Sequence, residues 1–178
     1  TPTLGQAKAQ ALRDRIASIH PGCEVLAVEE FVSPDNWPAL LPAAVDVLVD
    51  ACDQVRAKAT LAAWGRREDV GLVCVGAAGG KRAAQAVEVD DLAAVTHDPL
   101  LASLRQRLRQ DGAAPRSGRM GVRCVFSRES VAAPAGSCEA GDGTLNCHGY
   151  GSSVAVTATF GMVAAGEAIT QLLMTPGS

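Results

Sequence analysis

The sequence has few aromatic residues and no excess of basic charge. Aromatic side chains make up 3% of its 178 residues, so the core must be built mainly from alanine, valine and leucine. Such small apolar residues suit helices packed closely on a sheet. The formal net charge is −3, which excludes a protein that binds nucleic acid through its overall charge. Any nucleic-acid contact must therefore use a local basic patch.

The sequence also lacks any Cys-x-x-Cys pair among its six cysteines, which argues against a structural zinc site. Cys52 and Cys74 lie in apolar, strand-like runs, where we expect buried thiols. Cys138 and Cys147 lie in a glycine- and serine-rich segment, where a thiol can be exposed. The chain is not a small disulfide scaffold, and we expect it in a reducing cytoplasm.

What the sequence does contain is an apolar, β-branched run that leads into two carboxylates. Residues 45–50 predict a buried strand with Asp50 at its end. Asp53 follows closely, and residues 54–67 predict a helix. Because α/β proteins bind ligands beyond the carboxyl ends of parallel strands, Asp53 lies where a phosphate-bound Mg²⁺ or a substrate is expected. The alternative is that Asp53 caps the helix, since aspartate is among the best N-cap residues, and the two roles can coexist.

The rest of the chain alternates between strands and helices before it becomes less regular. Apolar spacing and turn residues predict helices over residues 4–19, 98–110 and 153–174, and strands over residues 23–28, 70–75, 86–90 and 122–126. Residues 76–80 form a glycine-rich turn after a strand. Residues 127–151 form a long loop, and loops of this length are usually functional or disordered.

The last predicted helix contains the longest apolar run, residues 154–165. Thr157, Thr159 and Gly161 interrupt it, and Glu167 follows closely. A membrane-spanning helix needs about 20 predominantly apolar residues. We therefore expect a buried or interface helix and no membrane insertion.

The order of elements predicts an α/β fold with a mainly parallel sheet and a C-terminal elaboration. We expect one domain over residues 1–178, with residues 1–85 in the core and residues 86–178 as the C-terminal subregion. A complete nucleotide-binding α/β domain opens with a strand and a glycine-rich phosphate loop, whereas this sequence opens on a helix. We therefore expect the later part of a larger domain, with a segment of about 80–90 residues before residue 1.

Five segments of the sequence resemble those of one family, in the same order. They are DACDQVRAKATL, VCVGAAGGK, VDDLAAVTHDPLLASLRQRLR, GVRCVFSRE and SSVAVTATFGMVAAGEAI. The family is that of the tRNA threonylcarbamoyladenosine dehydratases, in the ThiF/MoeB, ubiquitin-activating-like superfamily of adenylating enzymes. The resemblance implies a Rossmann-like, ThiF-type fold. It also implies that the family's glycine-rich loop, ribose-binding acidic residue and phosphate-binding Arg and Lys lie before residue 1.

The resemblance implies an ATP-dependent, ligase-type dehydration of threonylcarbamoyladenosine in tRNA. The substrate carboxylate would attack the α-phosphate of ATP, and the neighbouring carbamoyl group would close the acyl-adenylate into a ring. ATP and Mg²⁺ are the implied cofactors. Asp53 matches the carboxylate that serves the Mg²⁺–ATP site, and Asp50 is the weaker candidate beside it. Gly76, Gly79 and Gly80 are implied as a backbone wall of the nucleotide or substrate pocket, and the alternative is a tight turn.

The same resemblance gives the basic residues a candidate role as tRNA contacts. The candidates are Lys81, Arg82, Arg105 and Arg109, and the alternative is a solvated helix face. The resemblance further implies a homodimer and a sulfur-transfer protein as a candidate partner. Two other functions stay open, which are an adenylyltransferase that activates the C-terminus of a sulfur-carrier protein and a non-catalytic fragment.

Overall fold

The computed structural model describes residues 3–41, 43–131 and 151–174. It divides into two compact units, Thr1–Ala44 and Val45–Ser178. Among its described residues the first unit contains one helix, α1 (Lys8–Ile19), which begins four residues later than the sequence predicts. The expected strand over residues 23–28 is wrong, because these residues pair with no other described segment and Leu26 is 64% exposed. Alternating apolar residues do not form a strand without a hydrogen-bonding neighbour.

In the part of the second unit that the structure describes, four strands form the sheet. They are β1 (Val47–Asp50), β2 (Gly71–Val75), β3 (Val87–Asp91) and β4 (Arg123–Ser127). Their order in the sheet is β1-β2-β4-β3, and only β3 runs antiparallel to its neighbour. The predicted α/β fold with a mainly parallel sheet is thus confirmed. The ends of β1, β2 and β4, with the loops that follow them, form one edge, which we term the carboxyl edge.

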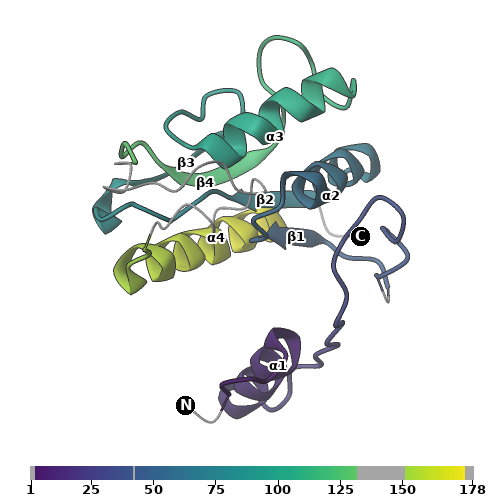
Figure 1. The fold of residues 1–178 in the computed structure, drawn as a ribbon. Helices are drawn as coiled ribbons and strands as arrows, with labels where there is room; N and C mark the ends of the chain where they lie inside the picture. The colour runs from purple at the N-terminus through teal and green to yellow at the C-terminus, as the bar shows by residue number, and fades with distance from the viewer. Residues whose placement is uncertain (1–2, 42, 132–150, 175–178) are drawn as a thin grey trace. The chain divides into compact units, whose positions relative to one another are not determined.

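Helices cover both faces of this sheet (Figure 1). The helices α2 (Val55–Glu68) and α3 (Pro99–Gln110) pack on one face, and α4 (Val154–Met174) packs on the other. Side chains alternate between the two layers, because Leu72 and Cys74 of β2 contact the α2–α3 side while Val73 packs with Phe160 of α4. A short 3₁₀ helix, η1 (Ala84–Ala86), precedes β3. The strands and helices of this unit begin and end within two residues of their predicted ranges.

The start of α3 is set by a side chain. The Asp98 carboxylate accepts a hydrogen bond from the Leu101 N–H at 3.0 Å, and Pro99 occupies the first helical turn. Aspartate at the N-cap followed by proline is a strong signal for a helix start, and the sequence prediction is confirmed here. The predicted apolar face is also buried, with Leu100, Leu101, Leu104 and Leu108 at 6% exposure or less.

The helix α4 packs only a narrow face on the sheet. Val156, Phe160 and Ala164 are buried, whereas Met162 and Leu173 are more than 70% exposed. An ion pair between Arg123 of β4 and Glu167, at 2.9 Å, adds a polar contact between α4 and the sheet. By length and composition alone α4 could cross a membrane, which is weak evidence because core helices pass the same test.

Asp91 ties the end of β3 to the segment before β4. Its carboxylate accepts hydrogen bonds from the main-chain N–H groups of Ala93, Met120 and Gly121, at 2.7–2.9 Å. Burial opposes ionisation of Asp91, but these three donors and Arg119 outweigh it, so its pKa lies below the ordinary value of 3.8. The ionised carboxylate therefore stabilises the fold.

We expect Asp91→Asn to lower the free energy of unfolding by about 1–3 kcal/mol at pH 7, because N–H donors lose a charged acceptor. A lowered folded-state pKa gives stability that is complete above the ordinary value of 3.8 and is lost as the pH falls through the folded-state pKa. Urea unfolding at several pH values measures this, with the exposed Asp46→Asn as control. A deficit that stays constant down to pH values of about 2 would contradict this role.

Candidate active site

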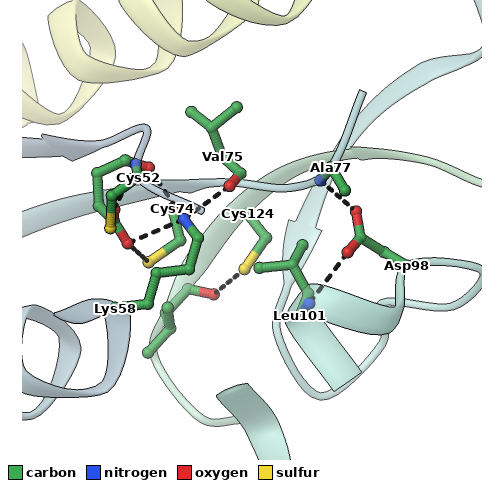
Figure 2. A network of polar contacts seen from close by, with 10 residues as sticks. Cys52, Lys58, Cys74, Val75, Ala77, Asp98, Leu101 and Cys124 are labelled. Carbon is green, nitrogen blue, oxygen red and sulfur yellow. Dashed lines mark hydrogen bonds and ion pairs between the residues drawn. The ribbon is translucent and has the colours of Figure 1, made fainter. Parts of the chain in front are cut away.

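A buried ion pair lies at the carboxyl edge, where β1 and β2 end (Figure 2). The Lys58 ammonium of α2 is 3.0 Å from the Asp50 carboxylate, and both side chains are fully buried. The same ammonium donates a hydrogen bond to the Val75 carbonyl at 2.8 Å and to the Asp50 carbonyl at 3.3 Å. One lysine thus joins the ends of two strands to the helix that follows the first. Burial opposes the charge on Lys58, but Asp50 outweighs it, so the pKa of Lys58 is raised.

Thiols complete the shell around the Asp50 carboxylate. The Cys52 N–H and thiol donate to it at 3.0 and 2.8 Å, and the buried Cys74 thiol lies at 3.6 Å. Burial, and then the charge of Asp50, raises the pKa of Cys52 to about 12. Burial likewise raises the pKa of Cys74 well above its ordinary value. Both sulfurs are therefore neutral thiols at physiological pH, and neither is an activated nucleophile.

Asp53 has the opposite environment, although it lies only three residues from Asp50. Its side chain is exposed, and within the described ranges its carboxylate has no hydrogen bond or ion pair. The N-cap of α2 is Gln54, and no side chain in the described part of the chain caps this helix. The alternative that Asp53 is a helix cap is therefore not realised. A carboxylate beyond the end of a parallel strand remains available for a ligand.

Packing explains the first glycine of the loop after β2. A side-chain carbon at Gly76 would overlap the Asp98 carboxylate, which also accepts the Ala77 N–H at 2.8 Å (Figure 2). The Gly76 N–H itself donates to the Val125 carbonyl at 2.8 Å. Further along, Gly80 has a φ of 73° and donates its N–H to Gly151 at 2.9 Å. This loop follows the strand end as the sequence predicts, and its contacts tie it to α3 and β4.

Lys81 points into the protein. It is 2% exposed, and its ammonium donates to the carbonyls of His97, Ser127 and Glu129 at 2.9–3.1 Å. The next residue, Arg82, is exposed and uses its main-chain N–H to bind the Glu129 carboxylate. Of these two predicted tRNA contacts, Arg82 lies at the surface, whereas the Lys81 side chain is buried and bonded to main-chain carbonyls.

The arginines that are close in sequence do not form one patch. Arg105 donates to the carbonyls of Leu92 and Val95 at 3.1 and 2.7 Å. Arg107 pairs with Asp111, and Arg123 pairs with Glu167. The Arg109 Nε is buried and, among the described residues, has no hydrogen-bond acceptor. Arg105, Arg107 and Arg123 therefore have separate partners within the protein.

A cleft of about 490 Å³ opens at the amino end of α3. It lies between residues 95–99 and residues 130–131, and Arg105 reaches it from α3. His97 is exposed at this cleft and has a φ of 58°, which is an uncommon backbone conformation for histidine. Its Nδ1 lies 2.9 Å from the Thr96 hydroxyl. The cleft walls follow from tertiary contacts, so the sequence pattern alone did not reveal it.

Sequence reasoning also missed Lys58, the partner of Asp50. The signal was a single lysine on the otherwise apolar side of a predicted helix, eight residues after Asp50.

No group of three or more metal-ligating side chains occurs in the described ranges. Asp53 alone still suits Mg²⁺, because this ion is usually held by one or two carboxylates together with phosphates and water. Cys138 and Cys147 lie outside the described residues.

Comparisons with known proteins agree with the fold and point to one family. The model of the ThiF family matches residues 1–178. The chain is 39% identical to the tRNA threonylcarbamoyladenosine dehydratase of Escherichia coli K12, over 96% of this chain and 68% of the relative. It is 32% identical to the protein of the same name from Haemophilus influenzae, over 96% of this chain and 67% of the relative.

Solved structures show the same likeness. The crystal structure of the E. coli dehydratase TcdA in complex with ATP superposes with a TM-score of 0.83 and 38% identity. That match covers 95% of this chain and 65% of the solved chain. The AMP complex of the same protein gives a TM-score of 0.82, with the same coverage. The chain therefore spans about two thirds of the length of the proteins it matches.

The two carboxylates after β1 should differ sharply in their effect on stability. We expect Asp50→Asn to lower the free energy of unfolding by about 3–5 kcal/mol, because it leaves the Lys58 charge buried without its partner. The matched variant Asp53→Asn should change it by less than about 0.5 kcal/mol, since Asp53 is exposed. Urea unfolding of both variants measures this difference. Equal losses in the two variants would contradict the assignment.

Gly76→Ala should destabilise the fold by about 1–3 kcal/mol, because the added carbon displaces a carboxylate that holds Ala77 and caps α3. Gly161→Ala is the matched control, since no atom of the described residues lies within 4 Å of the added carbon in α4. That change should stabilise the helix by up to about 1 kcal/mol. Thermal unfolding compares the two variants. A Gly76→Ala protein as stable as the wild type would show that packing does not require this glycine.

Proposed function

The chain belongs to the ThiF family, and we propose that it carries out the ATP-dependent dehydration of threonylcarbamoyladenosine in tRNA. The observation that carries the proposal is the free Asp53 carboxylate at the carboxyl edge, in a chain similar to an ATP-bound dehydratase. The relatives are named for this substrate class. Because the chain spans about two thirds of those relatives, the activity is proposed for the protein at its full length.

The reaction consists of two substitutions. First, a carboxylate oxygen of the threonyl group attacks the α-phosphorus of ATP, the bond to the β-phosphate breaks, and pyrophosphate leaves. Second, the neighbouring carbamoyl group attacks the activated carbonyl carbon, a ring forms, and AMP leaves while a proton passes to solvent. The elements of water are lost from the nucleoside, and hydrolysis of ATP to AMP and pyrophosphate drives the loss.

In this proposal Asp53 would hold Mg²⁺ at the phosphates of ATP. Such an ion neutralises the charge that develops on the phosphate oxygens during attack. We assign Asp50 a supporting role, since Lys58 and thiols surround its carboxylate. The buried pair holds the end of β1, and thereby sets where Asp53 stands. Gly79 and Gly80 belong to the loop that follows the neighbouring strand, and we propose that this loop forms part of the pocket wall.

Recognition of tRNA would rest on basic side chains that the fold leaves available. Arg82 is exposed at the carboxyl edge, and the partly buried Arg109 lines a second cleft of about 640 Å³ with Arg119. Arg105 faces the first cleft and is held there by two carbonyls.

The exposed apolar residues of α4 support the proposal of a homodimer. A cytoplasmic location suits a tRNA-modifying enzyme, while a sulfur-transfer partner stays a prediction.

An assay of the full-length protein with ATP and threonylcarbamoyladenosine-containing tRNA tests this function. We expect a cyclic nucleoside to appear by mass spectrometry, and Asp53→Ala to abolish it while the protein stays folded. Asp46→Ala is the matched control, because this exposed aspartate lies at the opposite end of β1. Lack of product with the wild type, together with adenylation of a sulfur-carrier C-terminus, would favour the alternative enzyme. Full activity of Asp53→Ala would exclude the role of that carboxylate.

A further inference from the structure

Lys81 is a buried cation whose nearest partners are all main-chain carbonyls. The three acceptors come from two segments: Ser127 ends β4 and Glu129 lies just beyond it, whereas His97 lies two residues before α3. An ammonium has three N–H donors, so every donor is matched by one acceptor. A neutral amine has only two such donors and would leave one carbonyl unpaired. The arrangement is therefore built for the charged form.

The positive charge of Lys81 is balanced by carboxylates that do not contact its ammonium group. Within the described residues no carboxylate forms an ion pair with Lys81. Burial lowers the pKa of Lys81, and the nearby charges of Asp98 and Glu129 oppose that effect. A lysine held in this way has no donor left for a phosphate. The role of Lys81 must therefore lie in the segments that its three carbonyl acceptors hold in place.

A reciprocal contact strengthens the same junction. The Glu129 carbonyl accepts from Lys81, while the Glu129 carboxylate accepts the N–H groups of Arg82 and Ala83 at 2.9–3.0 Å. The Gly80 N–H donates to the Gly151 carbonyl at 2.9 Å. The loop after β2 therefore holds a residue before the 132–150 connection and a residue after it.

The carbonyls that bind Lys81 also adjoin both walls of the cleft at α3. His97 lies in one wall, and Glu129 directly precedes Ser130 and Val131 of the other. His97 has a left-handed backbone, which persists only where surrounding contacts hold it. Lys81 supplies such a contact through the His97 carbonyl. Lys81 thus links the two walls, beside a hydrogen bond that Arg128 donates to the Thr96 hydroxyl at 3.0 Å.

We propose that Lys81 is a positioning residue that ties the two walls of this cleft together at the width that accepts the modified nucleoside of tRNA. The proposal rests on the proposed function. A volume of about 490 Å³ lies in the range of small-molecule pockets. The cleft lies beside β4, whereas Asp53 follows β1 on the far side of β2. ATP and the nucleoside would therefore approach the same edge from different strands.

Hydrogen exchange tests the positioning role without reference to activity. In the full-length protein, Lys81→Met should speed exchange of the amides at residues 82–83 and 127–129. The charge control Arg116→Met, at an exposed arginine, should leave them unchanged. Should Lys81→Met fail to fold, Lys81→Ala with propylammonium replaces it, because this ion restores the deleted ammonium. Protection should return with propylammonium but not with tetramethylammonium. Unchanged exchange in the lysine variants would overturn the proposal.

Steady-state kinetics tests the link to the substrate. Lys81→Met should raise the KM for tRNA by about tenfold and leave the KM for ATP within about twofold, because only the nucleoside cleft changes. The salt dependence of tRNA affinity should keep its slope. A slope reduced by about one would show that Lys81 contacts a phosphate, and would overturn the proposal. If the wild type forms no cyclic product, the proposed function fails, and hydrogen exchange alone decides the positioning role.

Discussion

The buried pair of Asp50 and Lys58 is the interaction on which the carboxyl edge depends. Lys58 reaches from α2 to the Asp50 carboxylate and to the Val75 carbonyl, so one charge joins β1, α2 and β2. Removing two charges from water is costly, and the geometry repays that cost only when hydrogen bonds satisfy both groups. Here two thiols and a main-chain N–H complete the shell around the carboxylate. The fully bonded pair therefore explains why β1, α2 and β2 are held together at this edge.

Buried charges also hold the other loops of the carboxyl edge, and these structural groups differ from the group that we assign to chemistry. Asp98 binds the Ala77 N–H, and Lys81 binds three carbonyls, so buried charges hold each loop that follows a parallel strand. Asp53 differs from these groups, because it is exposed and has no partner within the described ranges. A site that binds ATP needs a rigid frame and a few free polar groups. We infer that the buried charges supply the frame and that Asp53 supplies one of the groups.

Much of the fold could be predicted from the sequence, because its signals are local. The apolar run before Asp50, the Asp98–Pro99 cap and the leucine face of α3 each identify an element without tertiary information. The strand expected over residues 23–28 failed for the opposite reason, since a strand depends on a neighbour that the pattern does not show. The pairing of Lys58 with Asp50 and the three acceptors of Lys81 likewise depend on segments brought together only by folding.

A double-mutant cycle of Asp50→Asn and Lys58→Met tests the central claim most directly. If the pair is the link between β1, α2 and β2, the two substitutions should be strongly coupled, because the second removes the charge that the first leaves unpaired. We expect a coupling free energy of about 2–3 kcal/mol from urea unfolding of the four proteins. Effects that add to within about 0.5 kcal/mol would contradict the account, because they would show that the two groups contribute independently.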